Sequence, residues 1–168
     1  AKPEDELFKA IEKGELHRNF QGYTTKGGAD LIGIGVTSIG DGVDYYAQNF
    51  KDLPTYEKAI DDGELPVFKG YKLSKDDILR QFVIMELMSN FSLDMKRVEK
   101  EFNINFAEYF SDALTALQEF VEADLVTITE DKIEVSQTGT MLIRNISMPF
   151  DAYLNNIPED KRRFSKTI

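Results

Sequence analysis

The sequence predicts a mixed α+β protein that is mostly helical. We expect a winged-helix-like C-terminal domain of helices plus a β-hairpin, preceded by the last helix–strand piece of a partial α/β barrel. Apolar residues recur at three- and four-residue spacing over much of 74–123, which predicts helices. Apolar and polar residues alternate over 126–135, which predicts a hairpin. Near the N-terminus, a helix-like segment and a glycine-rich loop precede a continuous apolar run, as at the end of such a barrel.

The first 50 residues make up the predicted barrel piece. Residues 3–13 are expected to be helical, because Pro3 suits a first turn and Gly14 a C-terminal stop. A polar loop over 18–28 then leads into 31–36, a run that is apolar on both faces, like a buried parallel strand. One parallel strand is not stable alone, so either this run pairs in an unusual way or its sheet lies outside this sequence.

The rest of the chain divides into a connector at 51–70, with a helix expected at 54–63, and a helical domain at 71–168. Ser74 and Asp77 resemble a capping box at the start of the first helix of that domain. The expected elements are helices at 74–90, 95–102 and 106–123, hairpin strands at 126–129 and 132–135, and a final helix at 138–154.

Composition excludes several classes of protein. The formal net charge of −10 argues against a nucleic-acid partner and against an anionic membrane surface. No apolar run approaches the ~18 residues that a membrane helix needs. The chain has no cysteine, which excludes thiolate-held zinc and an iron–sulfur cluster held by this chain. His17 is the single histidine and cannot build a histidine metal site alone.

Few residues suggest chemistry by themselves. Gly33, Gly35 and Gly40 do not have the spacing of the dinucleotide-binding motif. Two interpretations of these glycines remain: they allow close packing of the backbone against neighbouring strands, or they belong to a loop that contacts a ligand. Gln21 offers a donor and an acceptor that suit an adenine or carboxylate edge, or it belongs to a simple turn. His17 is expected to bond locally, and the basic run at 161–163 to be a solvated tail or to neutralise an anionic substrate.

Three stretches in one order resemble a known family. They are Leu16-His17-Arg18-Asn19-Phe20-Gln21-Gly22-Tyr23-Thr24-Thr25, Leu31-Ile32-Gly33-Ile34-Gly35-Val36-Thr37-Ser38-Ile39-Gly40-Asp41 with Tyr46-Ala47-Gln48-Asn49 after it, and the segment 141–154. The tail Arg163-Phe164-Ser165 also fits. Together they resemble the C-terminal part of the oxygen-independent coproporphyrinogen III oxidases, which are radical S-adenosylmethionine enzymes.

The resemblance implies a parent that decarboxylates two propionate side chains of coproporphyrinogen III to vinyl groups in haem biosynthesis, using a [4Fe–4S] cluster and S-adenosylmethionine. It implies that Ile39 lines the S-adenosylmethionine site and that Gln21 lies near it. The family's cluster motif, C-x-x-x-C-x-x-C, is absent, so we expect no cofactor and no catalytic residue in this chain, and no turnover by it alone. The expected partners are the parent's own N-terminal catalytic domain and the porphyrinogen, in the cytoplasm.

Two non-catalytic interpretations compete with the fragment of an enzyme. Helices followed by a hairpin also suit a winged-helix module that binds DNA or another protein. A DNA reader needs a basic recognition helix, and the expected helix at 106–123 contains no Lys or Arg. A protein-interaction domain would instead use the apolar face that a missing barrel leaves open.

Overall fold

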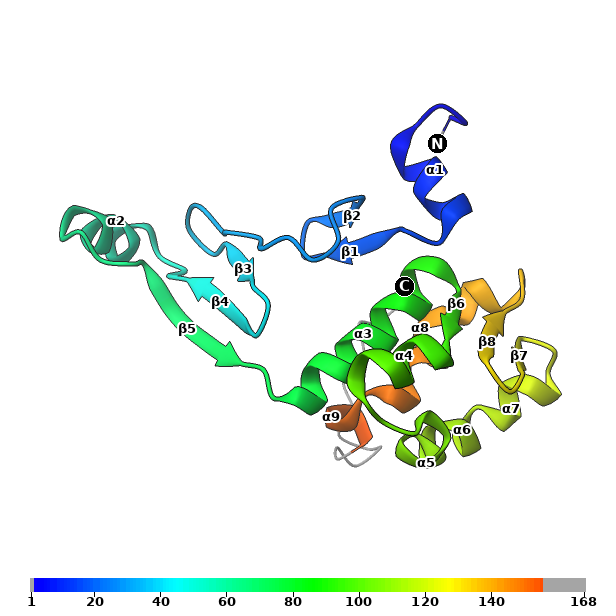
Figure 1. Ribbon diagram of the computed structural model, residues 1–168. Helices are drawn as coiled ribbons and strands as arrows, with labels where there is room; N and C mark the ends of the chain where they lie inside the picture. Colours follow the sequence, from blue (N-terminus) through cyan, green and yellow to red (C-terminus); the bar gives the residue numbers. More distant parts are fainter. Residues whose placement is uncertain (1, 156–168) are drawn as a thin grey trace. The chain divides into compact units, whose positions relative to one another are not determined.

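The computed structural model describes residues 2–155, and the chain divides into two compact units, 1–78 and 79–168. The fold is mixed α/β, with short antiparallel sheets among helices (Figure 1). The basic run at 161–163 and the tail motif at 163–165 lie outside the described residues.

The first unit opens with helix α1, Glu6–Lys13, and a hairpin of β1, His17–Asn19, and β2, Gly22–Thr24. The Asp5 side chain accepts a hydrogen bond from the Leu7 amide at 2.8 Å, so α1 begins after Asp5 rather than at Pro3. We predicted a plain loop where the hairpin lies. Its turn forms because the Asn19 side chain accepts from the Gln21 amide at 2.8 Å and Gly22 adopts a φ of 128°.

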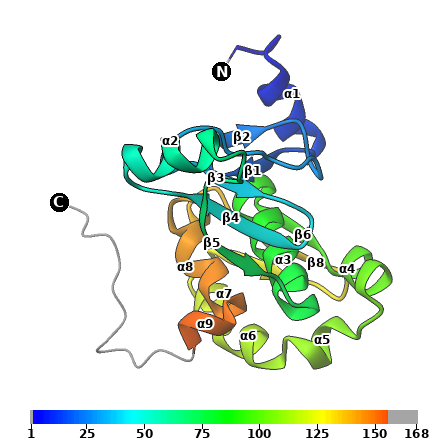
Figure 2. The same cartoon turned by 90° about the vertical axis from the view of Figure 1, so that its left-hand side faces the viewer.

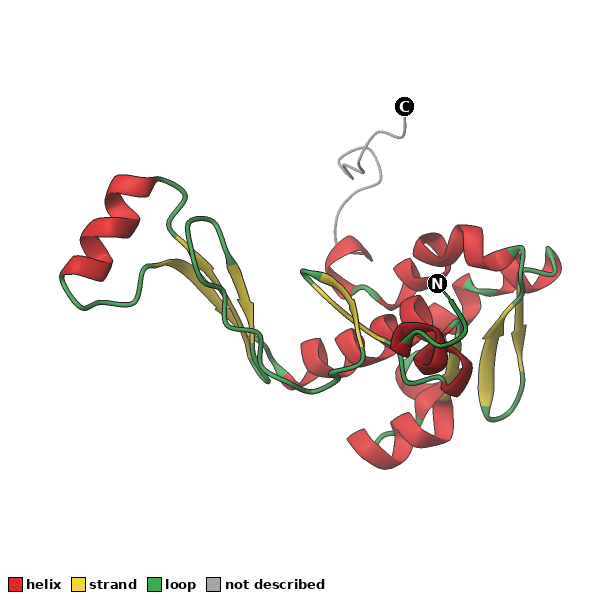
Figure 3. Cartoon of the chain, turned by 90° about the horizontal axis from the view of Figure 1, so that it is seen from above, coloured by secondary structure: helices red, strands yellow, loops and turns green. Residues whose placement is uncertain are grey.

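The main sheet of this unit has three antiparallel strands in the order β3-β4-β5. They are β3, Ile39–Asp41, β4, Tyr45–Asn49, and β5, Val67–Lys72. Helix α2, Leu53–Asp61, joins β4 to β5 and lies at one end of the sheet (Figure 3). It was expected at 54–63, but the connector carries a strand as well.

The predicted parallel strand over 31–36 is wrong. Only Leu31 pairs, in an isolated antiparallel bridge to Asp41. Gly35 has a φ of 100° and Thr37 a φ of 65°, conformations that interrupt an extended strand. The apolar run is therefore a loop, and Ile32 and Ile34 are 77% and 85% exposed in it.

The second unit is built on helix α3, Lys75–Asn90, which begins at the end of the first unit, and on helix α4, Met95–Phe102, which has the predicted bounds. Ser74 and Asp77 cap α3 reciprocally, as expected from the sequence. Between these helices lies β6, Ser92–Asp94, which joins the predicted hairpin of β7, Val126–Ile128, and β8, Lys132–Val135. Their sheet order is β6-β8-β7.

Two predicted helices are broken into shorter pieces, as Figure 2 shows for α5 and α6. The segment at 106–123 becomes α5, Phe106–Tyr109, α6, Ser111–Ala116, and α7, Gln118–Glu122. The first break falls at Phe110, whose φ and ψ of −108° and 26° are not helical. The segment at 138–154 becomes η1, Gly139–Leu142, α8, Ile143–Ser147, η2, Met148–Phe150, and α9, Ala152–Asn155. Pro149 lies in η2, where it has no amide to donate to a continuing helix.

One apolar core holds the second unit together. Its fully buried apolar members come from the helices, from the junction of α6 and α7, and from β6 and β8: Val83, Leu87, Leu93, Val98, Phe106, Leu117, Ile133, Ile146 and Phe150. Burial of this apolar surface is the main stabilising contribution to a unit whose helices are mostly short.

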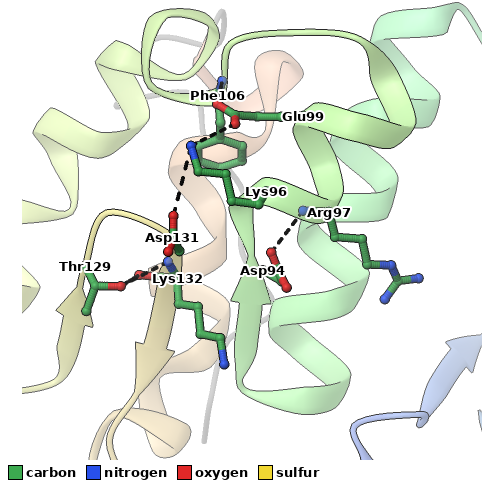
Figure 4. Close-up of polar contacts among 8 residues, drawn as sticks. All are labelled: Asp94, Lys96, Arg97, Glu99, Phe106, Thr129, Asp131 and Lys132. Carbon is green, nitrogen blue, oxygen red and sulfur yellow. Dashed lines mark hydrogen bonds and ion pairs between the residues drawn. The ribbon is translucent and has the colours of Figure 1, made fainter.

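Polar contacts tie α4 to its neighbours (Figure 4). Asp94 accepts from the Arg97 amide at 2.9 Å and so caps α4. Glu99 accepts from Lys96 at 3.1 Å and from the Phe106 amide at 2.9 Å, which holds the start of α5 against α4. The Phe106 amide and Lys96 lower the pKa of the Glu99 carboxyl below its ordinary value.

Candidate functional site

One face of the β3-β4-β5 sheet carries two rows of larger side chains. Because opposed residues in a sheet share a face, the pairing places Ile39, Gln48 and Lys69 in one row. The second row, two residues along each strand, is Asp41, Tyr46 and Tyr71. We call these six residues the ligand face.

The hairpin turn covers part of this face. The Phe20 ring packs edge-to-face on Tyr46, with 5.3 Å between the ring centroids. A cavity of about 350 Å³ lies there, within the range of small-molecule sites. It is lined by Phe20, Ile39, Tyr46, Ala47, Gln48, Lys69, Gly70 and Tyr71. Phe20 and Tyr71 are about half exposed, so their rings are available to a ligand.

The loop that leads into the ligand face is held by partly buried hydrogen bonds. The Asn49 amide donates to the carbonyl of Gly33 at 3.1 Å and to that of Gly35 at 2.9 Å. The Tyr56 hydroxyl accepts from the Gly35 amide at 3.2 Å. Gly33 packs so closely that a Cβ there would lie 2.9 Å from the Ile39 carbonyl carbon. These contacts fix the backbone just before Ile39.

The acidic groups and the basic group of the ligand face lie on different strands. Burial, followed by the nearby Asp30, raises the pKa of the Asp41 carboxyl. Burial, followed by Asp41 and Asp77, raises the pKa of Tyr46 to about 12, so this phenol stays protonated at neutral pH. Lys69 supplies a positive charge on the opposite edge strand. The ligand face therefore presents the carboxyl of Asp41 and the phenol of Tyr46 in one row, and the ammonium of Lys69 in the other row on the opposite edge strand.

The two residues expected near a cofactor are not equally placed. Ile39 lines the cavity, whereas Gln21 is exposed in the hairpin turn and does not line it. Its neighbour Phe20 does. His17 lies against Gly27, where an added Cβ would meet the imidazole.

The sequence alone assigned no role to Lys69 or Tyr71. One feature of the sequence could have indicated that they share a face. Lys69 and Tyr71 are two residues apart in a short polar and aromatic run, and side chains at this spacing lie on the same face of a strand. That signal was weak because Gly70 sits between them.

The residues of this chain do not fit an iron–sulfur cluster, because the sequence contains no cysteine to supply a thiolate. Within residues 2–155 there is also no group of three His, Asp or Glu side chains arranged to hold a metal ion. Over the same residues, no helix is both long and apolar enough to cross a membrane.

Comparison with known proteins identifies relatives over the full chain. Residues 73–142 match the family described as the HemN C-terminal domain. All of the chain aligns with the oxygen-independent coproporphyrinogen III oxidase of Helicobacter pylori strain J99 at 51% identity, covering 36% of that relative. The enzyme of the same name from Escherichia coli K12 is 43% identical, again over 100% of this chain and 36% of its own length. The chain thus spans about a third of these curated relatives.

A solved structure agrees with these alignments. The coproporphyrinogen III oxidase HemN of Escherichia coli, described as a radical SAM enzyme, superposes with a TM-score of 0.87 at 44% identity. The match covers 91% of this chain and 35% of that one. Residues 73–142 therefore match the HemN C-terminal domain, and the whole chain is similar to about a third of the length of these oxygen-independent coproporphyrinogen III oxidases.

Proposed function

We propose that this chain is part of an oxygen-independent coproporphyrinogen III oxidase, which converts coproporphyrinogen III to protoporphyrinogen IX in haem biosynthesis. The observation that carries the proposal is the alignment of all 168 residues with enzymes of that name at up to 51% identity. In this reaction a propionate side chain gives up one hydrogen atom, one electron and its carboxylate as CO2, and a vinyl group remains.

The cofactor chemistry belongs to residues outside this sequence. When bound, the cluster and S-adenosylmethionine supply the radical that removes the hydrogen atom. We propose that Ile39 packs against S-adenosylmethionine, supported by its position in the cavity of the ligand face. We propose Gln21 for a polar contact nearby, supported by its place in the turn next to Phe20, which lines the same cavity.

The second unit has a covering role in this proposal. A radical intermediate needs a site from which water and oxygen are excluded. We propose that the compact helical unit excludes water and oxygen from the site. Its apolar core is made of residues of the second unit and includes none of the ligand-face residues. We also propose a winged-helix-like architecture for this unit, a cytoplasmic location, and a barrel end for residues 1–50 that lacks the parallel strand expected over 31–36.

A DNA-binding module without catalysis is the alternative, and no observation favours it. The helices α5, α6 and α7 contain no Lys or Arg, and the net charge is −10.

A chimera tests the proposed function. The aligned segment of the Escherichia coli oxidase is replaced by this chain, and anaerobic conversion of coproporphyrinogen III is measured. We expect protoporphyrinogen IX to form. A chimera that retains its cluster absorbance but forms no product would contradict the proposal.

Two substitutions in the same chimera test the proposed cofactor contacts. Ile39→Ala and Gln21→Ala are each expected to raise the S-adenosylmethionine concentration needed for half-maximal rate. Tyr23→Ala, which changes an exposed ring in the same hairpin that does not line the cavity, serves as the control. An unchanged requirement in both variants would remove these residues from the cofactor site.

A further inference from the structure

We propose that Lys69 anchors a propionate carboxylate of the tetrapyrrole substrate, and that Phe20, Tyr46 and Tyr71 form the aromatic wall against which a pyrrole ring packs. This inference rests on the proposed function, because that function supplies a substrate with several carboxylates. It assigns to the ligand face a role in substrate orientation that is separate from the cofactor contact proposed for Ile39.

The charge of Lys69 is available to a ligand. Within residues 2–155, the ammonium group of Lys69 forms no ion pair or side-chain hydrogen bond, and Lys69 lines the cavity. Lys72, on the same strand, differs in both respects. Adjacent strand residues alternate between faces, so Lys72 lies on the opposite side of the sheet, where its ammonium is 3.6 Å from a carboxylate oxygen of Asp44.

The rings around Lys69 suit a flat heterocycle. Tyr71 is two residues along β5 on the same face, and Tyr46 lies opposite Tyr71 on β4. Phe20 stands edge-on to Tyr46 at 5.3 Å. Aromatic side chains favour stacked or edge-on contacts with another ring, and the cavity of about 350 Å³ accommodates part of a tetrapyrrole, with the remainder outside it.

The spacing across the sheet decides which propionate Lys69 would hold. Ile39 and Lys69 occupy the same row on β3 and β5, with Gln48 between them on β4. Two strand spacings separate them by roughly 10 Å at the backbone. A carboxylate at Lys69 is thus well removed from a cofactor at Ile39. In this proposal Lys69 is a positioning residue that holds a propionate other than the one undergoing decarboxylation at that step.

S-adenosylmethionine also carries a carboxylate, so an experiment must separate the two sources. Coproporphyrin III, the stable oxidised form with the same propionates, is titrated into the chain and followed by porphyrin fluorescence. The variants are Lys69→Gln, Lys69→Arg and the matched control Lys72→Gln. Circular dichroism checks that each variant keeps its fold, and S-adenosylmethionine is titrated in parallel by calorimetry.

We expect Lys69→Gln to raise the dissociation constant for coproporphyrin III about fivefold, as loss of one partly solvated charge contact predicts. Lys69→Arg should restore most of the affinity, and Lys72→Gln should stay within about twofold. The tetramethyl ester of coproporphyrin III, which has no carboxylate, should bind the wild-type chain and the Lys69→Gln variant equally.

Equal affinity of the wild-type chain and Lys69→Gln for coproporphyrin III would overturn the inference. So would a loss confined to S-adenosylmethionine, or no coproporphyrin binding by the wild-type chain. None of these results affects product formation by the chimera, which tests the proposed function separately.

Discussion

Removing the Asn49 side chain should release the loop that leads into the ligand face. Asn49 is 7% exposed, and its amide donates to the Gly33 and Gly35 carbonyls at 3.1 and 2.9 Å. Each hydrogen bond contributes about 1 kcal/mol net, so Asn49→Ala should lower the free energy needed to open the loop at residues 33–37 by about 2 kcal/mol. That energy corresponds to a roughly 30-fold change in the opening equilibrium. Amide hydrogen exchange at Gly35 and Thr37, whose N–H groups bond Tyr56 and Phe50, reports it directly.

Gln48→Ala is the matched control for this experiment. Gln48 precedes Asn49 on β4 and makes one long contact, 3.5 Å from its Nε2 to the Thr37 carbonyl oxygen. Its loss should change the exchange of the same amides by less than about threefold. If Asn49→Ala leaves their protection unchanged, or if both variants lower it equally, the loop is not held by Asn49.

Three further predictions concern the second unit. Leu117→Ala should lower the free energy of unfolding by about 3 kcal/mol in urea titration, because Leu117 is fully buried, and a loss below about 1 kcal/mol would contradict the described core. Ser89→Ala should be neutral or stabilising by up to about 1 kcal/mol, because the buried Ser89 hydroxyl has no hydrogen-bond partner within the described residues. A marked loss of stability in Ser89→Ala would contradict this prediction, because it would show that the Ser89 hydroxyl has a hydrogen-bond partner. The pKa of Glu99 is lowered in the folded protein, so its contribution is present above the ordinary value of 4.5 and disappears as pH falls through the folded pKa. Glu99→Gln should therefore flatten the fall of the urea midpoint below pH 4.5, and an unaltered acid profile would exclude this role.

Local signals explain which elements could be predicted. Helix α4 has its predicted bounds because Asp94 caps it, Asn103 ends it in a left-handed conformation, and Met95 and Val98 share its buried face. The hairpin of β7 and β8 was predicted because its strands are adjacent in sequence and alternate in polarity. Each of these features is encoded within a few residues.

The ligand face could not be assembled in this way. Strand β5 pairs with β4 across the intervening helix α2, so nothing near Lys69 in the sequence identifies Gln48 as its neighbour. The apolar run at 31–36 imitates a buried strand by composition, whereas the backbone at Gly35 turns it into a loop. The resemblance to a known family indicated Ile39, which lines the cavity. The neighbours of Ile39 on the ligand face are set by the pairing of β3, β4 and β5, which the sequence did not reveal.

The most direct test of the proposed function is the anaerobic reaction of the chimera, with coproporphyrinogen III and protoporphyrinogen IX quantified by chromatography after oxidation to porphyrins. We predict that substrate is consumed and that protoporphyrin appears in matching amount, with release of two CO2 per molecule because two propionates become vinyl groups. A chimera with the cluster absorbance of the parental oxidase, but with substrate unchanged and no protoporphyrin, would contradict this prediction.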